Sequence, residues 1–240
     1  MKRQAAHLSE SLSHRLNAYA LAASAAGVSV LALAQSGEAK IVYTKAHVVL
    51  HSRSNSHYLL DLNHDGIKDF NLRHAYTAST TNDPYNNSSM EAVPFKDASN
   101  GFVGKVVITE DVASALYAGV KVGPSNNFVY FGVMGRAEGN SQRTNTLFAY
   151  YWANSGKGVR NRYLGLRFAI KGKLHYGWAR VTVSKYRFTE TLTGFAYETV
   201  ANKSIVTGKT KGPDVITVHD PSLGHLARGA SAIPVWRQGK

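Results

Sequence analysis

Two neighbouring segments with the pattern of a β-hairpin, residues 163–170 and 174–183, place the tightest constraint on the fold. In the first segment, apolar side chains occupy every second position, which is typical of a strand with one buried face: Leu164, Leu166, Phe168 and Ile170. Lys171-Gly172-Lys173 has the composition of a tight turn between two strands. The sequence therefore predicts a β-hairpin whose first strand is half-buried.

Short β-rich segments separated by Gly, Asn and Ser turns fill most of the remaining chain. They cover residues 40–51, 58–60, 70–72, 104–109, 128–134, 146–152, 188–199 and 204–207. Many short strands with turns between them indicate an all-β fold, a β-sandwich or jelly roll.

Two segments are expected to depart from this pattern. Glu110 to Ala118 is predicted to form one short helix, capped by Thr109 and ended by Gly119. Residues 76–100 are polar with little hydrophobic periodicity, which predicts an extended surface loop.

The two ends of the chain are predicted to lie outside this domain. Residues 1–39 carry a basic start and an alanine-rich apolar run, which is typical of a secretory signal peptide. The alternative is a membrane anchor, for which the run is short. The domain is then expected at 40–212, followed by a flexible basic tail at 213–240 that is too polar to cross a bilayer. These features predict export to the cell surface, periplasm or medium.

Composition narrows the chemistry. The chain has no cysteine, which excludes disulfides, thiol catalysis and thiolate metal sites. Removal of the signal peptide leaves 25 basic and 13 acidic side chains, a net charge of +12. Such a charge favours anionic cell-surface polymers or glycans as partners. Export makes a nucleic-acid partner unexpected.

The segment from Asp61 to Phe70 has the ligand spacing of a calcium loop. Calcium prefers six to eight oxygen ligands. Such oxygens are offered by the side chains of Asp61, Asn63, Asp65 and Asp69 and by the carbonyl of Ile67, with Gly66 at the sharp turn. The expected site residues are therefore Asp61, Asn63, Asp65, Ile67 and Asp69.

The second half of the loop departs from the pattern. Leu72 stands where a bidentate carboxylate is usual, so another segment must supply oxygens or the site is weak. Asp83, Glu91 and Asp97 are nearby in sequence. The alternative is a hydrogen-bonded turn that binds no metal. His64 within the loop is expected to be solvated.

Other chemical groups give weaker signals. The ten histidines form no zinc or nucleophile motif, and His175 is expected to be a half-exposed strand residue. Glycoside hydrolysis needs two facing carboxylates, for which Glu138, Glu190 and Glu198 are available without a telling spacing. Aromatic residues that could stack on sugars are more readily explained as core: Tyr150, Tyr151, Trp152, Tyr176 and Trp178.

Two motifs carry a family resemblance. Residues 174–181 contain Tyr176-Gly177-Trp178-Ala179-Arg180, and residues 193–199 contain Ala196-Tyr197-Glu198. With the signal peptide and the Asp61 loop, they resemble a group of uncharacterised secreted bacterial β-sandwich proteins, many of which carry a PEP-CTERM sorting tail. The resemblance implies export and a β-sandwich, and it implies no reaction. The Pro-Glu-Pro signature and the long apolar helix of such tails are absent.

The sequence thus predicts an exported, non-catalytic surface or matrix protein with a structural Ca²⁺ loop. The alternative is a carbohydrate-active enzyme or a glycan-binding module that acts on extracellular polysaccharide.

Overall fold

The computed structural model describes residues 39–78, 85–95, 99–140, 147–185 and 188–219. Residues 1–38 of the expected signal peptide and most of the expected tail lie outside these ranges. The strands are β1 Ile41–Leu50, β2 His57–Leu60, β3 Phe70–Ala78, β4 Tyr85–Pro94, β5 Gly101–Val107, β6 Glu110–Ala113, β7 Lys121–Val122, β8 Phe128–Val129, β9 Gly132–Asn140, β10 Leu147–Ala149, β11 Val159–Ile170, β12 Lys173–Val183, β13 Glu190–Glu198, β14 Ile205–Val206 and β15 Val215–His219. A 3-10 turn, η2, spans Asn154–Gly156.

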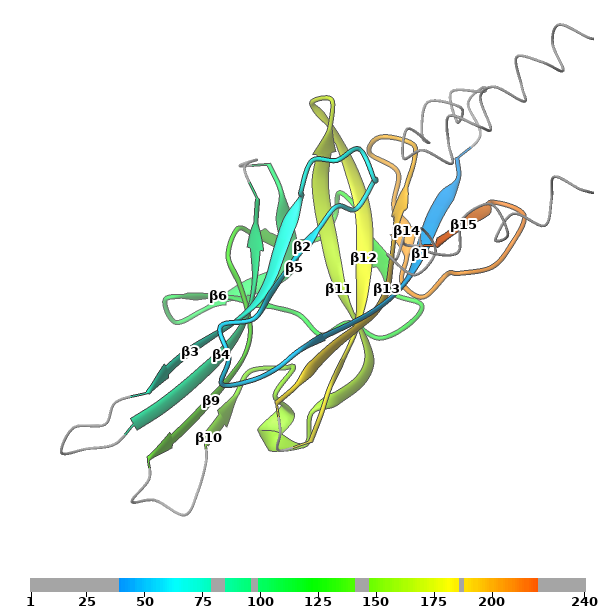
Figure 1. Cartoon of the computed structure of the whole chain (residues 1–240). Coiled ribbons are helices and arrows are strands. Elements are labelled where there is room, and N and C mark those ends of the chain that lie inside the picture. Colours follow the sequence, from blue (N-terminus) through cyan, green and yellow to red (C-terminus); the bar gives the residue numbers. More distant parts are fainter. Residues whose placement is uncertain (1–38, 79–84, 96–98, 141–146, 186–187, 220–240) are drawn as a thin grey trace, which may run out of the picture.

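One continuous sheet curls until its two halves face each other (Figure 1). The first half has the order β15-β1-β13-β12-β11, and the second has the order β6-β9-β4-β3-β2. Strand β5 joins them, because Phe102 pairs with β11 while Gly104 pairs with β6. The all-β, sandwich-like fold is confirmed.

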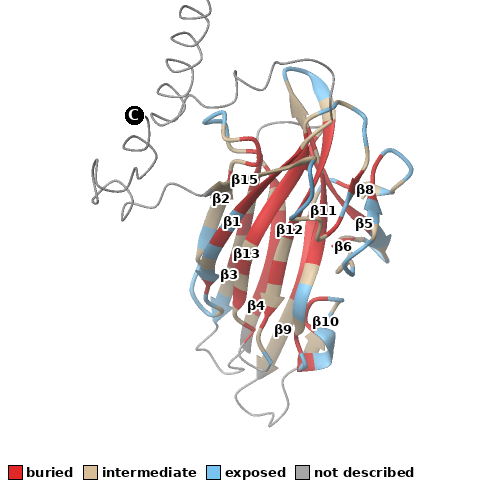
Figure 2. Cartoon of the chain, turned by 90° about the vertical axis from the view of Figure 1, so that its right-hand side faces the viewer, coloured by how far each residue is buried: buried red, intermediate tan, exposed pale blue. Residues whose placement is uncertain are grey.

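The central strands of the first half, β11, β12 and β13, are buried along much of their length on both faces (Figure 2). Its inner face contributes Leu164, Leu166 and Phe168 to the large core between the halves. Its outer face carries Tyr163, Tyr176 and Trp178, which pack with Val122 and Ile205 of the small β7–β14 sheet. The hairpin was expected to be half-buried, and the cover supplied by β7 and β14 explains the difference.

The predicted helix at Glu110–Ala118 is wrong. Glu110 to Ala113 form β6, which pairs antiparallel with β5 after a turn at Ile108, whose φ is 58°. Val112 and Ala113 are fully buried. The tertiary pairing therefore overrides a local helix preference.

The surface loop expected over residues 76–100 is also wrong for the described part. Strand β4 lies between β3 and β9 and carries buried Ser88, Ser89 and Glu91. Arg73 and Ser89 donate hydrogen bonds to the Glu91 carboxylate at 2.8 and 2.6 Å. Because these bonds satisfy the Glu91 carboxylate and the Ser89 hydroxyl, a strand forms without the hydrophobic alternation that the sequence argument required.

Two boundaries differ from expectation. The apolar run at residues 128–134 is broken at Tyr130 and Phe131 into β8 and β9. Residues 215–219, expected in the tail, form β15, which pairs parallel to β1 from Ile41 with Val215 to Lys45 with His219. Among the described residues, no helix is long and apolar enough to cross a membrane.

The β5–β6 pairing can be tested at Gly104. An added Cβ there would lie 2.3 Å from the backbone oxygen of Val112, so the two strands would have to separate. We expect Gly104→Ala to destabilise the protein by about 3 kcal/mol in urea unfolding, at the upper end for an overpacked site. Gly172→Ala, where φ is +75° and nothing lies within 4 Å, is the control and should cost about 1 kcal/mol. Equal costs would contradict the close approach of β5 and β6.

Candidate metal centre

The loop predicted to bind calcium connects β2 to β3, as expected. Three backbone N–H groups donate to its carboxylates. Leu62 N donates to Asp69 Oδ2 at 2.7 Å, Gly66 N to Asp61 Oδ2 at 2.9 Å and Ile67 N to Asp65 Oδ1 at 2.8 Å. Such bonds suit both a calcium loop and a turn that binds nothing.

Two oxygen atoms of the loop lack hydrogen-bond partners in the part of the chain that the structure describes. Asp61 Oδ1 and Asn63 Oδ1 are buried and have no hydrogen-bond partner among the described residues. They belong to the first and third positions of the ligand pattern. Asn63 is 4% exposed, and its Nδ2 donates to Asp65 Oδ2 at 2.9 Å. Buried oxygens without partners are costly, and a cation would satisfy both.

The surroundings of Asp69 disfavour its charged form. Burial raises the pKa of Asp69 to about 7, and the charges of Asp61 and Asp65 add to the effect. Burial also raises the pKa of the Tyr197 hydroxyl to about 12, with smaller contributions from the same carboxylates. Lys68 lies 3.7 Å from Asp61 Oδ2, but its side chain is 40% exposed, so solvent screens it.

The ligand set is incomplete in side chains alone. Among the described residues, no three His, Cys, Asp or Glu side chains converge closely enough to hold a metal. Asn63 and the carbonyl of Ile67 would therefore have to contribute.

Position twelve of the loop carries no oxygen in its side chain. Leu72 is fully buried in the core. Glu91, one of the proposed substitutes, is bound by Arg73 and Ser89. Asp83 and Asp97 lie outside the described residues.

The loop packs across to the opposite half of the sheet. Leu62 is fully buried and lies beside Gly177. A Cβ added at Gly177 would lie 2.8 Å from Leu62 Cδ2. His64 was expected to be solvated, but it is half-buried, with its ring 5.7 Å from that of Phe195. Its Nε2 lies 2.7 Å from Thr44 Oγ1. The loop thus connects the two halves through contacts that the sequence did not indicate.

The aromatic residues are divided between core and surface. Tyr176, Trp178 and Trp152 are buried, at 2%, 0% and 0% exposure, which confirms the core interpretation for them. Tyr151 is 41% exposed and remains available at the surface.

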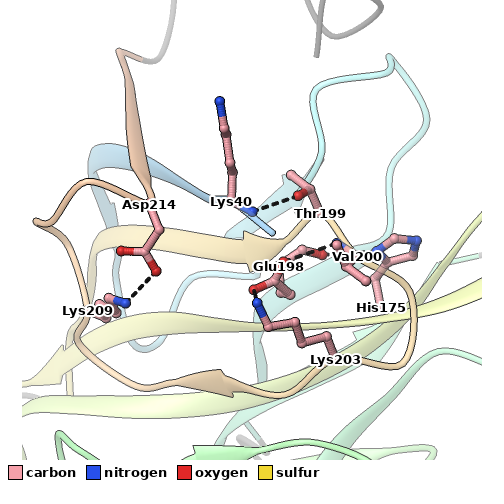
Figure 3. Close-up of polar contacts among 8 residues, drawn as sticks. All are labelled: Lys40, His175, Glu198, Thr199, Val200, Lys203, Lys209 and Asp214. Atoms are coloured by element: carbon pink, nitrogen blue, oxygen red, sulfur yellow. Dashed lines mark hydrogen bonds and ion pairs between the residues drawn. The ribbon is translucent and has the colours of Figure 1, made fainter. Parts of the chain in front are cut away.

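Glu198 and His175 have structural surroundings at the end of β13 (Figure 3). Val200 N donates to Glu198 Oε1 at 3.1 Å, and Lys203 lies 3.5 Å from Oε2. His175 was expected to be half-exposed, but it is buried, with Nδ1 2.9 Å from the Glu198 carbonyl oxygen. In the same region, Lys40 N donates to Thr199 Oγ1 at 3.0 Å.

Glu190 and His74 form a buried pair that sequence reasoning missed. His74 Nε2 lies 3.8 Å from Glu190 Oε2, and neither side chain has a hydrogen-bond partner among the described residues. Burial raises the pKa of Glu190 to about 8 and lowers that of His74, also affected by His51, to about 4. The neutral forms of Glu190 and His74 are therefore both favoured.

Glu190 and Glu198 do not form the carboxylate pair that glycoside hydrolysis needs. They lie at opposite ends of β13, about 26 Å apart at strand spacing, which is too far to share a substrate.

The buried Glu190 predicts a pH dependence. Its pKa rises from 4.5 to about 8 on folding, so its contribution to stability is full below pH 4.5 and is lost as the pH rises to about 8. His74 has the opposite effect, because its lowered pKa reduces stability at low pH. This effect acts only below its unfolded pKa of 6.5 and adds no pH dependence above it. Relative to Glu190→Gln, we expect the wild type to lose about 2 kcal/mol of unfolding free energy between pH 6.5 and 8. Urea denaturation across this range measures it.

Glu138→Gln is the matched control, because Glu138 has a 37% exposed side chain beside Arg136. This variant should keep the wild-type pH dependence. Parallel curves for wild type and Glu190→Gln would show that Glu190 does not titrate in this window.

Comparisons with known proteins gave no relative. No family model, no curated protein and no solved structure matched the chain. Function must therefore be inferred from the residues themselves.

Proposed function

We propose that this chain is an exported, non-catalytic surface or matrix protein whose Asp61–Asp69 loop takes up calcium as a structural ion. One observation carries the metal proposal. The oxygens left without partners, Asp61 Oδ1 and Asn63 Oδ1, are the ones that the first and third ligand positions require. In a turn that binds no metal, two buried oxygens without hydrogen-bond partners would be an uncompensated energetic cost.

The proposed role of the ion is to hold the loop in the conformation that packs on the opposite half of the sheet. Calcium would neutralise the carboxylates of the loop, including Asp69, whose charged form is disfavoured by burial and by the charges of Asp61 and Asp65. It would thereby secure Leu62 beside Gly177 and His64 beside Thr44. Because this arrangement exists only in the folded chain, ion binding would add to the free energy of folding.

Export and surface location are supported by the sequence of residues 1–39 and by the basic composition. The formal net charge of the whole chain is +13, which favours association with anionic polymers outside the cell. Absence of cysteine leaves the domain without disulfides, so a structural ion would supply the stabilisation that disulfides give many exported proteins.

Thermal unfolding of the purified chain tests the calcium loop. We expect calcium at about a hundred times its dissociation constant to add about 2.7 kcal/mol, or ~5–10 °C in Tm, relative to chelator. Asp61→Asn should abolish most of this shift, since it removes one ligand charge. Asp111→Asn is the matched control, because Asp111 lies outside the loop and accepts a hydrogen bond from Phe131 N at 3.2 Å.

Two results would contradict the proposal. One is an unchanged Tm at millimolar calcium. The other is an equal shift in wild type and Asp61→Asn, which would place any calcium effect elsewhere in the chain.

A further inference from the structure

A surface pocket of about 360 Å³ opens between the segment after β6, the segment after β10 and the start of β11. Its size falls in the range of small-ligand sites. Polar and aromatic side chains line it: Ser114, Tyr117, Tyr151, Asn154 and Arg162. Tyr117 is 67% exposed and Tyr151 is 41% exposed, so both rings offer area to a ligand.

Tyr117 and Arg162 are held together by backbone pairing. Leu116 and Tyr163 exchange two backbone hydrogen bonds, each 2.9 Å long, which place the residues on either side next to each other. Thr207 Oγ1 also donates to the Tyr117 carbonyl oxygen at 2.7 Å. The Arg162 guanidinium consequently lies 3.1 Å from the centre of the Tyr117 ring. This stacking fixes the guanidinium plane at the edge of the pocket.

Tyr151 is presented by a segment with unusual backbone conformation. Tyr150, Asn154 and Ser155 have φ values of 69°, 48° and 52°, in the left-handed region that few non-glycine residues adopt. Trp152 anchors the segment through its buried ring and a 3.2 Å hydrogen bond from Nε1 to the Ala113 carbonyl oxygen. Strained backbone of this kind concentrates at binding sites.

The pocket has a cationic character. Arg162 Nη1 is buried without a hydrogen-bond partner, and no carboxylate among the described residues forms an ion pair with Arg162. Lys105 adds a second positive charge, with Nζ 5.5 Å from the centre of the Tyr151 ring. The residues that line the pocket include no Asp or Glu. A guanidinium that forms no ion pair with the described carboxylates is suited to a ligand carboxylate.

We propose that this pocket binds an acidic oligosaccharide, with its sugar rings against Tyr117 and Tyr151 and a uronic carboxylate on Arg162. Aromatic faces suit the apolar faces of sugar rings, and Ser114 and Asn154 offer partners for hydroxyl groups. The choice of a saccharide over another anion rests on the proposed extracellular location. The pocket shares no residue with the calcium loop.

Calorimetric titration of the purified chain with trigalacturonate tests the proposal, with cellotriose as the neutral trisaccharide. We expect binding of trigalacturonate and at least tenfold weaker binding of cellotriose. Tyr117→Ala, Tyr151→Ala and Arg162→Gln should each weaken trigalacturonate binding about tenfold. Equal binding of the two sugars, or no binding at millimolar concentration, would overturn the acidic-saccharide assignment.

Matched controls separate the pocket from general attraction to a basic protein. Arg160→Gln removes the same charge from an exposed position two residues away, and Tyr130→Ala removes a tyrosine that is 53% exposed elsewhere. Both should bind trigalacturonate as the wild type does. Losses equal to those of the pocket variants would show non-specific polyanion binding. Tighter binding of a single-stranded oligonucleotide would also overturn the saccharide assignment.

A measurement on the unaltered protein avoids dependence on variant folding. Tetranitromethane nitrates exposed tyrosines, so bound trigalacturonate should protect Tyr117 and Tyr151 at least fivefold and leave Tyr130 unprotected. Equal nitration with and without the sugar would overturn the site. All titrations are run in chelator and in calcium, so that failure of this proposal is distinguished from failure of the calcium loop.

Discussion

Continuous backbone pairing through β5 is the constraint on which the rest of the molecule depends. Phe102 pairs with β11, and Gly104 pairs with β6, so one strand turns the sheet from its first half into its second. The absence of a side chain at Gly104 lets β6 approach this closely. Once the halves face each other, the Asp61 loop from one half meets Gly177 of the other, and the segment after β6 meets β11. The loop and the pocket both exist because the sheet curls.

The polar groups enclosed by this curl fall into two classes. Groups of the first class have hydrogen-bond partners. Arg73 and Ser89 donate hydrogen bonds to the Glu91 carboxylate. Arg180 similarly donates hydrogen bonds to Thr193 and Tyr43. Asp61 and Asn63 instead keep oxygens that no described group satisfies. Buried polar groups that have hydrogen-bond partners within the protein are explained by the fold alone. Groups without partners are where an ion, a proton or a ligand has a physical reason to bind.

The sequence predicted local features better than long-range ones. The hairpin around Lys171-Gly172 was correct because its alternation and its turn are both local. The strand β4 was missed because Glu91 can be buried only with a hydrogen bond from Arg73, which lies eighteen residues away in the sequence. The helix at Glu110 was wrong because pairing with β5 outweighs local preference. The calcium-loop residues were predicted from spacing, and their role as ligands stays a prediction. The Tyr117–Arg162 stack depends on a pairing between Leu116 and Tyr163 that no local pattern reveals.

The parallel pairing of β1 with β15 has a mechanical consequence. The described domain begins just before β1 and ends with β15, and the two strands run in the same direction. Tension applied between the two ends would therefore pull β1 and β15 past each other along their length. Every backbone bond of the ladder from Ile41 to Lys45 would carry load at once, instead of opening one after another. A domain tethered at one end and pulled at the other would resist extension through this shear geometry.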